Sequence, residues 1–241
     1  MQEQGLYEIN IANVLFLDIE TVPIYKDYEQ LPEVDKALWD KKTSKLNKTE
    51  DFDAHEFYSR AGIYAEFGKI VCISCGLITK DSKIRIKSFA SENEKELLTD
   101  FAAMLNKAYH APDKILCAHN GKEFDFPYIA RRMLINGIRL PKILQIAGKK
   151  PWEIQHLDTM ELWKFGDYKN YTSLATLTHI FGIPTPKDDI QGSDVHRIYW
   201  NEKDLPRIVT YCQKDVVAII QLFRKYRNET IFDDTAIIYA D

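Results

Sequence analysis

The chain contains little cysteine and no long hydrophobic run. Its 241 residues include four cysteines, too few and too unevenly spaced for a disulfide framework. Cys72 and Cys75 are three positions apart in a β-rich run, on opposite strand faces, which argues against a zinc knuckle. We expect Cys117 and Cys212 to be small core residues. No apolar stretch approaches the roughly 20 residues of a membrane span, and no signal peptide precedes the first strand. These absences predict a cytoplasmic protein without a membrane partner.

An excess of positive charge is absent as well. The formal net charge of −4 argues against a nucleic-acid binder of the basic-patch kind. It does not argue against one that uses divalent cations, because bound ions reverse the sign of an acidic site. The composition, 45% hydrophobic and 12% aromatic, is ample for a core. Since the sequence has no internal repeats and no low-complexity tract, we expect one domain over residues 1–241.

Apolar periodicity predicts alternating strands and helices. Strands are predicted from Val14 onward and at 69–78, 84–89, 114–118 and 154–159, and helices at 91–105, 125–136, 173–181 and 204–227. Between the first two strands, residues 22–67 form a polar and aromatic insertion with predicted helices at 33–42 and 53–67, and its Lys-rich part at 41–48 is expected to be exposed. This order predicts an α/β fold with a mixed five-stranded sheet flanked by helices.

Two acids follow a run of buried-strand residues near the N-terminus. The stretch Val14-Leu15-Phe16-Leu17-Asp18-Ile19-Glu20-Thr21 ends in Asp18 and Glu20, whose i, i+2 spacing puts them on one strand face. Adjacent carboxylates repel unless a cation lies between them, and Mg²⁺ or Mn²⁺ prefers such oxygen ligands. Taken alone, the pair is more typical of acids that begin a solvated loop.

A third acid, Asp125, lies where a predicted helix begins after the 114–118 strand. An aspartate at this position is more often a helix N-cap than a metal ligand. The ends of parallel strands in an α/β sheet nevertheless meet at one rim, so that Asp125 would emerge beside Asp18 and Glu20.

The last helix carries Asp215 at the border of an apolar stripe. An unpaired buried carboxylate is costly, so Asp215 must be exposed and paired, hydrogen-bonded or bound to metal. Pairing with Lys214 or Arg207 is the simple alternative. Tyr211 lies four residues earlier, on the same helical face.

Together these residues form an ordered set. Asp18-x-Glu20, then Asn120-Gly121-x-x-Phe124-Asp125-x-Pro127, then Tyr211-x-x-x-Asp215 resemble the three exonuclease motifs of the DEDD superfamily. Four further segments resemble the stand-alone bacterial 3′-5′ exonucleases related to the proofreading domain of family B DNA polymerases: Phe67-Gly68-Lys69-Ile70-Val71, His156-Leu157-Asp158-Thr159, Tyr171-Thr172-Ser173-Leu174 and Phe181-Gly182-Ile183-Pro184. Tyr211 is similar to the tyrosine of the DEDDy branch, since Thr210 stands where the histidine branch needs its histidine.

The resemblance implies a ribonuclease-H-like fold in which Asp18, Glu20, Asp125 and Asp215 hold two divalent ions, Mg²⁺ or Mn²⁺. Asp18 would bridge both ions, Glu20 and Asp215 would complete the ion on the nucleophile side, and Asp125 would support the other. Two such ions clamp a scissile phosphate. With an ordinary pKa of about 10, Tyr211 would stay neutral and orient the attacking water.

Position beside the motifs suggests residues that bind substrate. We expect Ile19 and Thr21 to line the pocket for the terminal nucleotide, and Asn120 and Phe124 to approach the next one. The loop with Lys164, Lys169, Asn170 and Tyr171 is of the type that grips phosphate and stacks a base, and is equally typical of a solvated surface. His119, His156 and Asp158 are expected to be structural.

The resemblance thus implies a metal-dependent 3′-5′ exonuclease that releases nucleoside 5′-monophosphates from single-stranded DNA or frayed ends, in DNA repair or maintenance. Its expected partner is a nucleic acid 3′ end. One alternative is a 3′-5′ exoribonuclease with the same site, because no motif shows whether a 2′-hydroxyl is sensed. The other is a catalytically weak nucleic-acid-binding module on the same fold.

Overall fold

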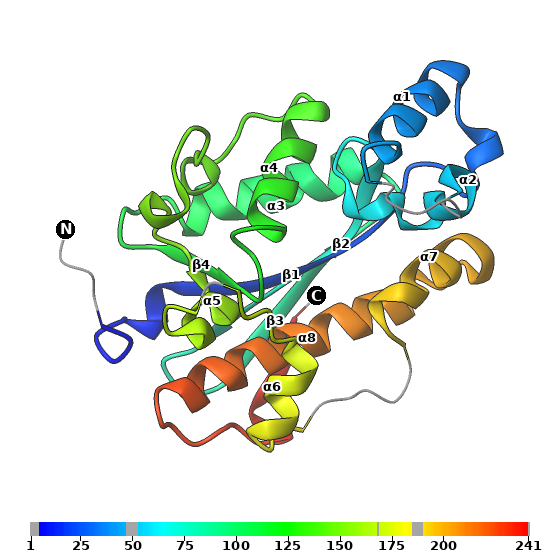
Figure 1. Cartoon of the computed structure of the whole chain (residues 1–241). Coiled ribbons are helices and arrows are strands. Elements are labelled where there is room, and N and C mark those ends of the chain that lie inside the picture. Colours follow the sequence, from blue (N-terminus) through cyan, green and yellow to red (C-terminus); the bar gives the residue numbers. More distant parts are fainter. Residues whose placement is uncertain (1–4, 47–52, 168, 185–189, 241) are drawn as a thin grey trace.

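The structure, a computed structural model, describes residues 5–46, 53–167, 169–184 and 190–240. A six-stranded mixed sheet with the order β5-β4-β1-β2-β3-β6 forms its centre (Figure 1). β1 pairs antiparallel with β2 and parallel with β4. The strands are β1 (Val14–Pro23), β2 (Gly68–Ile78), β3 (Ile84–Ala90), β4 (Ile115–Ala118), β5 (Leu157–Asp158) and β6 (Ile237–Ala240).

The α/β class is confirmed, with one strand more than the sequence analysis counted. The additional strand, β6, pairs parallel with β3 at the sheet edge. β5 is shorter than predicted because the Asp158 side chain accepts hydrogen bonds from the backbone of Met160 (2.9 Å) and Glu161 (3.3 Å) and caps a helix there. β1 does not stop at its acids but continues to Pro23, with a register shift between Glu20 and Thr21.

Helices cover both faces of the sheet. α3 and α4 lie on one face, and α6 and α8 lie on the other (Figure 1). None of the helices in the described ranges combines the length and the apolar composition needed to cross a bilayer. The helices are α1 (Glu33–Thr43), α2 (Ala54–Phe57), α3 (Glu94–Ala108), α4 (Asp125–Ile135), α5 (Thr159–Lys164), α6 (Leu174–Ile180), α7 (Val195–Arg197) and α8 (Leu205–Tyr226), with a 3₁₀ segment at Tyr58–Ile63 and a π-helical turn at Ile198–Glu202.

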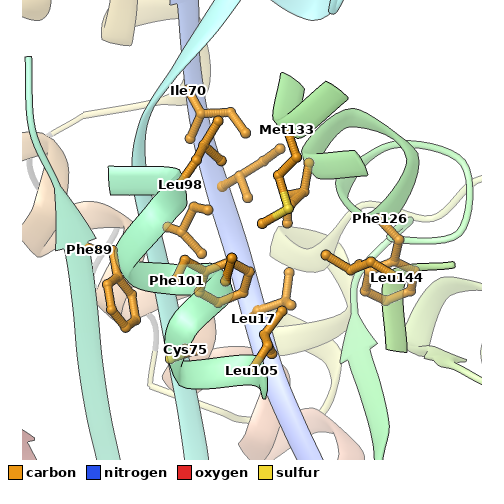
Figure 2. Packing of buried hydrophobic residues seen from close by; sticks show 14 of the residues in the cluster. Leu17, Ile70, Cys75, Phe89, Leu98, Phe101, Leu105, Phe126, Met133 and Leu144 are labelled. Carbon is orange, nitrogen blue, oxygen red and sulfur yellow. The ribbon is translucent and has the colours of Figure 1, made fainter. Parts of the chain in front are cut away.

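Side chains of β1 alternate between two cores. Leu15, Leu17 and Ile19 pack with α3 and α4 residues such as Phe101 and Met133 (Figure 2). Phe16, with the other even-numbered side chains, faces α8. Because successive strand residues point to opposite faces, Asp18 and Glu20 share the α8 side with Phe16 and Val22.

Close packing fixes α8 against the sheet. The Asp204 side chain accepts a hydrogen bond from the Arg207 backbone (3.2 Å) and caps the helix N-terminus. Gly76 of β2 lies beneath the helix, where an added Cβ would come within 2.9 Å of Val216 and Ile220 side-chain atoms. The absent side chain thus permits the close approach that sets the height of α8 above β1.

The insertion has its own small aromatic core. Trp39 of α1 is fully buried and packs edge-to-face on Tyr58, with ring centroids 5.5 Å apart. α1 agrees with the prediction, whereas the helix predicted for 53–67 is a short α2 followed by the 3₁₀ segment. Of the Lys-rich part, Lys41 and Lys45 are exposed, and 47 and 48 lie outside the described residues.

A buried ion pair joins the insertion to the main sheet. Arg132 of α4 donates to both carboxylate oxygens of Glu94 (2.8 and 2.5 Å) and to the Ala65 carbonyl oxygen (2.8 Å). Glu94 also accepts a hydrogen bond from the Ile70 backbone of β2 (2.7 Å). One pair therefore links α3, α4, β2 and the end of the insertion.

We expect Arg132→Ala to lower the free energy of unfolding by about 3–5 kcal/mol, because it leaves the Glu94 carboxylate buried without its charge partner. Urea denaturation followed by circular dichroism measures this. Lys36→Ala, which breaks the surface pair with Glu33, is the matched control and should cost less than about 1 kcal/mol. Equal effects of the two substitutions would contradict the role given to the buried pair.

Candidate active site

Asp18 and Glu20 project from β1 toward α8. Asp18 pairs in register with Ser74, and Glu20 pairs with Cys72 of the neighbouring β2. The Glu20 side chain belongs to the few buried acids, at 7% exposure. The register shift that directly follows Glu20 is of the kind that re-aims side chains beside active sites. β1 therefore presents two carboxylates in a partly closed space under α8.

α8 brings three residues to these carboxylates. The Cys212 thiol donates a hydrogen bond to Asp18 Oδ2, with a sulfur–oxygen distance of 3.4 Å. The charge of Asp215 acts on both Asp18 and Glu20, and the Tyr211 hydroxyl is hydrogen-bonded to the Asp215 side chain. Tyr211 and Asp215 are four residues apart and thus lie on one helical face.

Asp125 approaches from the other side of the sheet. It is the first residue of α4 and is 3% exposed. The preceding turn begins at Asn120, whose φ of 63° is in the left-handed region, and the Phe126 backbone donates to the Gly121 carbonyl oxygen (2.9 Å). Asp158 holds this turn by accepting hydrogen bonds from the backbone of Asn120 (2.9 Å) and Lys122 (3.1 Å).

Burial and mutual repulsion raise the pKa values of the clustered acids. Desolvation is the main cause for Asp18, and the charges of Glu20, Asp215 and Asp125 add to it. Burial, followed by the charge of Asp215, raises the pKa of Glu20 as well. Burial raises the pKa of Asp125 to about 8. Each charge makes ionisation of the next one more costly, so the cluster calls for a compensating cation.

The donor set fits a divalent metal. Oxygen atoms of Asp18 and Glu20 and the sulfur of Cys212 lie within 4.8 Å of one another. Carboxylate oxygens are the ligands of hard ions such as Mg²⁺ and Mn²⁺. The Cys212 thiol faces the same space as a hydrogen-bond donor, because burial raises its pKa and keeps it protonated.

Tyr211 is a neutral hydroxyl in this site. Burial raises its pKa, and the charges of Asp215, Glu20 and Asp18 raise it further. The ring packs beside the cluster of Val22, Ile208 and Cys212. A phenol in this state can donate or orient a hydrogen bond but does not act as a base near neutral pH.

The residues expected to bind substrate lie at different depths. The Ile19 side chain is 5% exposed and packs in the core under α3 and α4. Thr21 is half-buried and lies near the Tyr128 hydroxyl. The Tyr128 hydroxyl donates to the Gly62 carbonyl oxygen (2.7 Å), and its ring centroid is 5.2 Å from that of Phe124. Thr21 and Phe124 are thus brought to one place through Tyr128, whereas Ile19 presents its side chain to the core.

The loop after α5 is exposed. Tyr171 is 61% exposed, the Lys164 ammonium lies 3.9 Å from its ring centroid, and its hydroxyl donates to Glu123 (3.4 Å). Lys169 is exposed in the same loop. Glu123 joins this loop to the turn that precedes Asp125.

The two histidines near the motifs are structural, as expected. His156 accepts from the Leu116 backbone (3.3 Å) and donates to the Ile143 carbonyl oxygen (2.9 Å), and burial lowers its pKa to about 4. His119 bridges Thr159 (2.9 Å) and the Thr172 carbonyl oxygen (3.0 Å). Asp158 likewise ties down the neighbouring backbone.

Cys212 is the site residue that the sequence analysis left in the core. It is fully buried, as predicted, but it also contacts Asp18. Its position beside Tyr211 and one turn before Asp215 was the available signal. The apolar stripe of α8 does not single out Cys212, because a buried cysteine behaves as a small hydrophobic residue.

The fold and the cluster of acids together indicate the class of protein. A mixed sheet with helices on both faces and buried or partly buried acids from β1, α4 and α8 is the arrangement of a ribonuclease-H-like 3′-5′ exonuclease domain. A family model described as "Predicted 3'-5' exonuclease related to the exonuclease domain of PolB" matches residues 63–233. The chain belongs to this family, and exonucleases of this kind act on nucleic acid and use divalent metals. Asp125, Tyr211 and Asp215 lie inside the match, whereas Asp18 and Glu20 precede it.

Curated relatives and a solved structure agree with this assignment. The chain is 23% identical over 150 residues to a DNA polymerase of Pyrococcus glycovorans, covering 56% of this chain and 18% of the relative. It is 27% identical over 127 residues to that of Pyrococcus horikoshii, covering 48% and 10%. The family B DNA polymerase of Pyrobaculum calidifontis has the same fold, with a TM-score of 0.53 at 15% identity, covering 88% of this chain and 24% of that one. The chain therefore spans less than a quarter of each of these proteins.

The raised pKa values predict how stability depends on pH and metal. Folded Asp18, Glu20 and Asp125 retain protons that the unfolded chain releases near pH 4. The metal-free protein should therefore lose stability as the pH rises from about 5 to about 8. Mn²⁺ should raise the melting temperature more at about pH 8 than at about pH 6.

Thermal unfolding with EDTA and with Mn²⁺ at the two pH values tests this. Asp18→Asn is the matched variant, because it removes one charge at constant shape. It should flatten the pH dependence and weaken the stabilisation by Mn²⁺. A metal-free protein whose stability is the same at both pH values, with no response to Mn²⁺, would show that the carboxylates are not coupled as described.

Proposed function

We propose that the protein is a metal-dependent 3′-5′ exonuclease that hydrolyses the 3′-terminal phosphodiester of single-stranded DNA or frayed duplex ends. The observation that carries the proposal is the convergence of Asp18 and Glu20 from β1 with Tyr211 and Asp215 from α8. With Asp125 at the start of α4, these residues match the DEDDy order. The products are nucleoside 5′-monophosphates.

In this proposal Asp18, Glu20, Asp125 and Asp215 hold two divalent ions. When bound, the ions neutralise the scissile phosphate and lower the pKa of water at the site. Cys212 orients the Asp18 carboxylate through its 3.4 Å hydrogen bond. Tyr211, hydrogen-bonded to Asp215, presents its hydroxyl to the attacking water and fixes the water's direction without taking its proton.

DNA is the favoured substrate because the relatives that the chain matches are DNA polymerases. A role in DNA repair or maintenance follows from the removal of 3′ nucleotides. RNA is the competing substrate, and its exclusion requires a contact that senses the 2′-hydroxyl. We also propose that residues 1–241 act as one domain. The hydrogen bonds of Tyr128 to Gly62 (2.7 Å) and of Arg132 to Ala65 (2.8 Å), which tie the insertion to α4, support this.

Degradation of matched 5′-labelled single-stranded DNA and RNA tests the function. With Mg²⁺ or Mn²⁺ we expect a ladder that shortens from the 3′ end of DNA, faster than of RNA. Asp18→Ala should reduce the rate by at least about 10³-fold, since it removes a ligand shared by both ions. Asp100→Ala, which removes an exposed carboxylate of α3, should leave the rate unchanged.

Three outcomes distinguish the proposed exonuclease on DNA from its alternatives. Faster loss of RNA would move the assignment to an exoribonuclease. Binding of both strands without shortening, from a folded preparation with Mn²⁺, would favour a binding module. Endonucleolytic fragments, rather than a ladder from the 3′ end, would contradict the proposal as a whole.

Tyr211→Phe tests the role of the phenol. Loss of the hydroxyl should lower kcat by about 10²-fold or more, because the water loses its orienting partner while the metal ligands remain. Single-turnover cleavage of labelled DNA measures this. Stabilisation by Mn²⁺ should persist in this variant, unlike in Asp18→Asn, and its loss would mean that Tyr211 acts by holding Asp215 in place.

A further inference from the structure

A cavity lies next to the turn that precedes Asp125. It has a volume of about 290 Å³ and is lined by the turn at Asn120, by Pro127 and Arg131 of α4, by the segment from Lys149 to Ile154 and by the start of α5. This volume is at the lower end of small-ligand sites. Asn120 belongs both to the cavity and to the second exonuclease motif, so the cavity adjoins the candidate active site.

The charges at this cavity leave two cations available. Three acids line the cavity: Asp158 accepts hydrogen bonds from backbone N–H groups, Glu123 accepts one from the Tyr171 hydroxyl, and Glu161 pairs with Lys122 at 2.5 Å. Arg131 and Lys149 are exposed, and neither forms an ion pair within the part of the chain that the structure describes. The cavity wall is therefore able to receive an anion such as a phosphodiester.

Two exposed aromatic residues adjoin residues that line the cavity: Trp152 follows Pro151 in the chain, and the Tyr171 hydroxyl donates to Glu123. Trp152 is 76% exposed, and the Lys150 ammonium lies 5.2 Å from its ring centroid. Tyr171 is held in the same way by Lys164, which itself lines the cavity. Large exposed rings beside cations are the elements with which proteins bind single-stranded nucleic acid, because every base can stack on a ring and every phosphate is an anion.

We propose that this cavity and the flanking rings bind the nucleotides on the 5′ side of the scissile bond. Arg131 and Lys149 contact phosphates, and Trp152 stacks a base. The occupant is a single polynucleotide strand, since the surface offers charges and ring faces rather than a groove for a helix. The inference rests on the proposed exonuclease function and extends it: the enzyme favours strands long enough to reach from the metal ligands across this surface.

The test compares a long and a short substrate. A dodecadeoxynucleotide occupies both the candidate active site and the cavity, whereas the p-nitrophenyl ester of thymidine 5′-monophosphate reaches the active site alone. In Arg131→Ala/Lys149→Ala, kcat/KM for the dodecamer should fall about tenfold, through KM, and hydrolysis of the ester should be unchanged. The slope of log binding constant against log salt concentration should decrease in magnitude by about 1.4, because two phosphate contacts are lost.

Two further variants complete the design. Trp152→Ala should also lower kcat/KM for the dodecamer about tenfold, from the loss of one stacked base. Lys95→Ala/Lys107→Ala removes two exposed cations of α3 outside the cavity and is the charge-matched control. This control variant should keep the wild-type ratio of kcat/KM for the dodecamer to kcat/KM for the ester.

The proposal is overturned if the Arg131/Lys149 variant degrades the dodecamer like the wild type, or if it loses dodecamer and ester activity equally. Anisotropy of a labelled phosphorothioate dodecamer with Ca²⁺ separates this result from a failure of the proposed function. A wild type that is inactive on both substrates refutes the exonuclease. Strand binding then tests the cavity separately: the inference is supported if the Arg131/Lys149 variant binds the dodecamer about tenfold more weakly than the wild type, and is refuted if the two bind equally.

Discussion

The structure must accommodate repulsion between carboxylates that are held together in a partly buried site. Asp18, Glu20 and Asp215 lie close enough that each disfavours ionisation of the others. A protein gains no stability from such a cluster in the metal-free state. The fold must therefore supply the free energy that keeps the acids in place until cations bind, and the two cores on either side of β1 do so.

The elements that carry the acids are fixed by packing away from them. β1 is held between the core under α3 and α4 and the core under α8. α8 is set at its height by the side-chain-free Gly76, and α4 is anchored by the Arg132–Glu94 pair. Rigid support of this kind is what a site needs when its own charges push apart.

The clustered acids and the exposed cations near the site come from different elements. The acids and Tyr211 come from β1, α4 and α8, and they are wholly or partly buried. The exposed cations and rings come from Arg131 on the outer side of α4, from the loop after α5 and from the 149–154 segment. A net charge of −4 is compatible with both, because clustered acids and exposed cations such as Arg131 and Lys149 occupy different parts of the fold.

The sequence by itself determined the α/β class, the first five strands and the candidate acids, because these follow from local periodicity and from short motifs. It also indicated that His156 and Asp158 are structural. Only the tertiary structure decided that Asp18 and Glu20 face α8 rather than α4, since strand alternation leaves the choice of face open. β6, the capped start of α5 and the contact between Cys212 and Asp18 likewise came from the tertiary structure. Each joins segments far apart in the chain, and such contacts are selected by the packing of the whole sheet rather than by neighbouring residues.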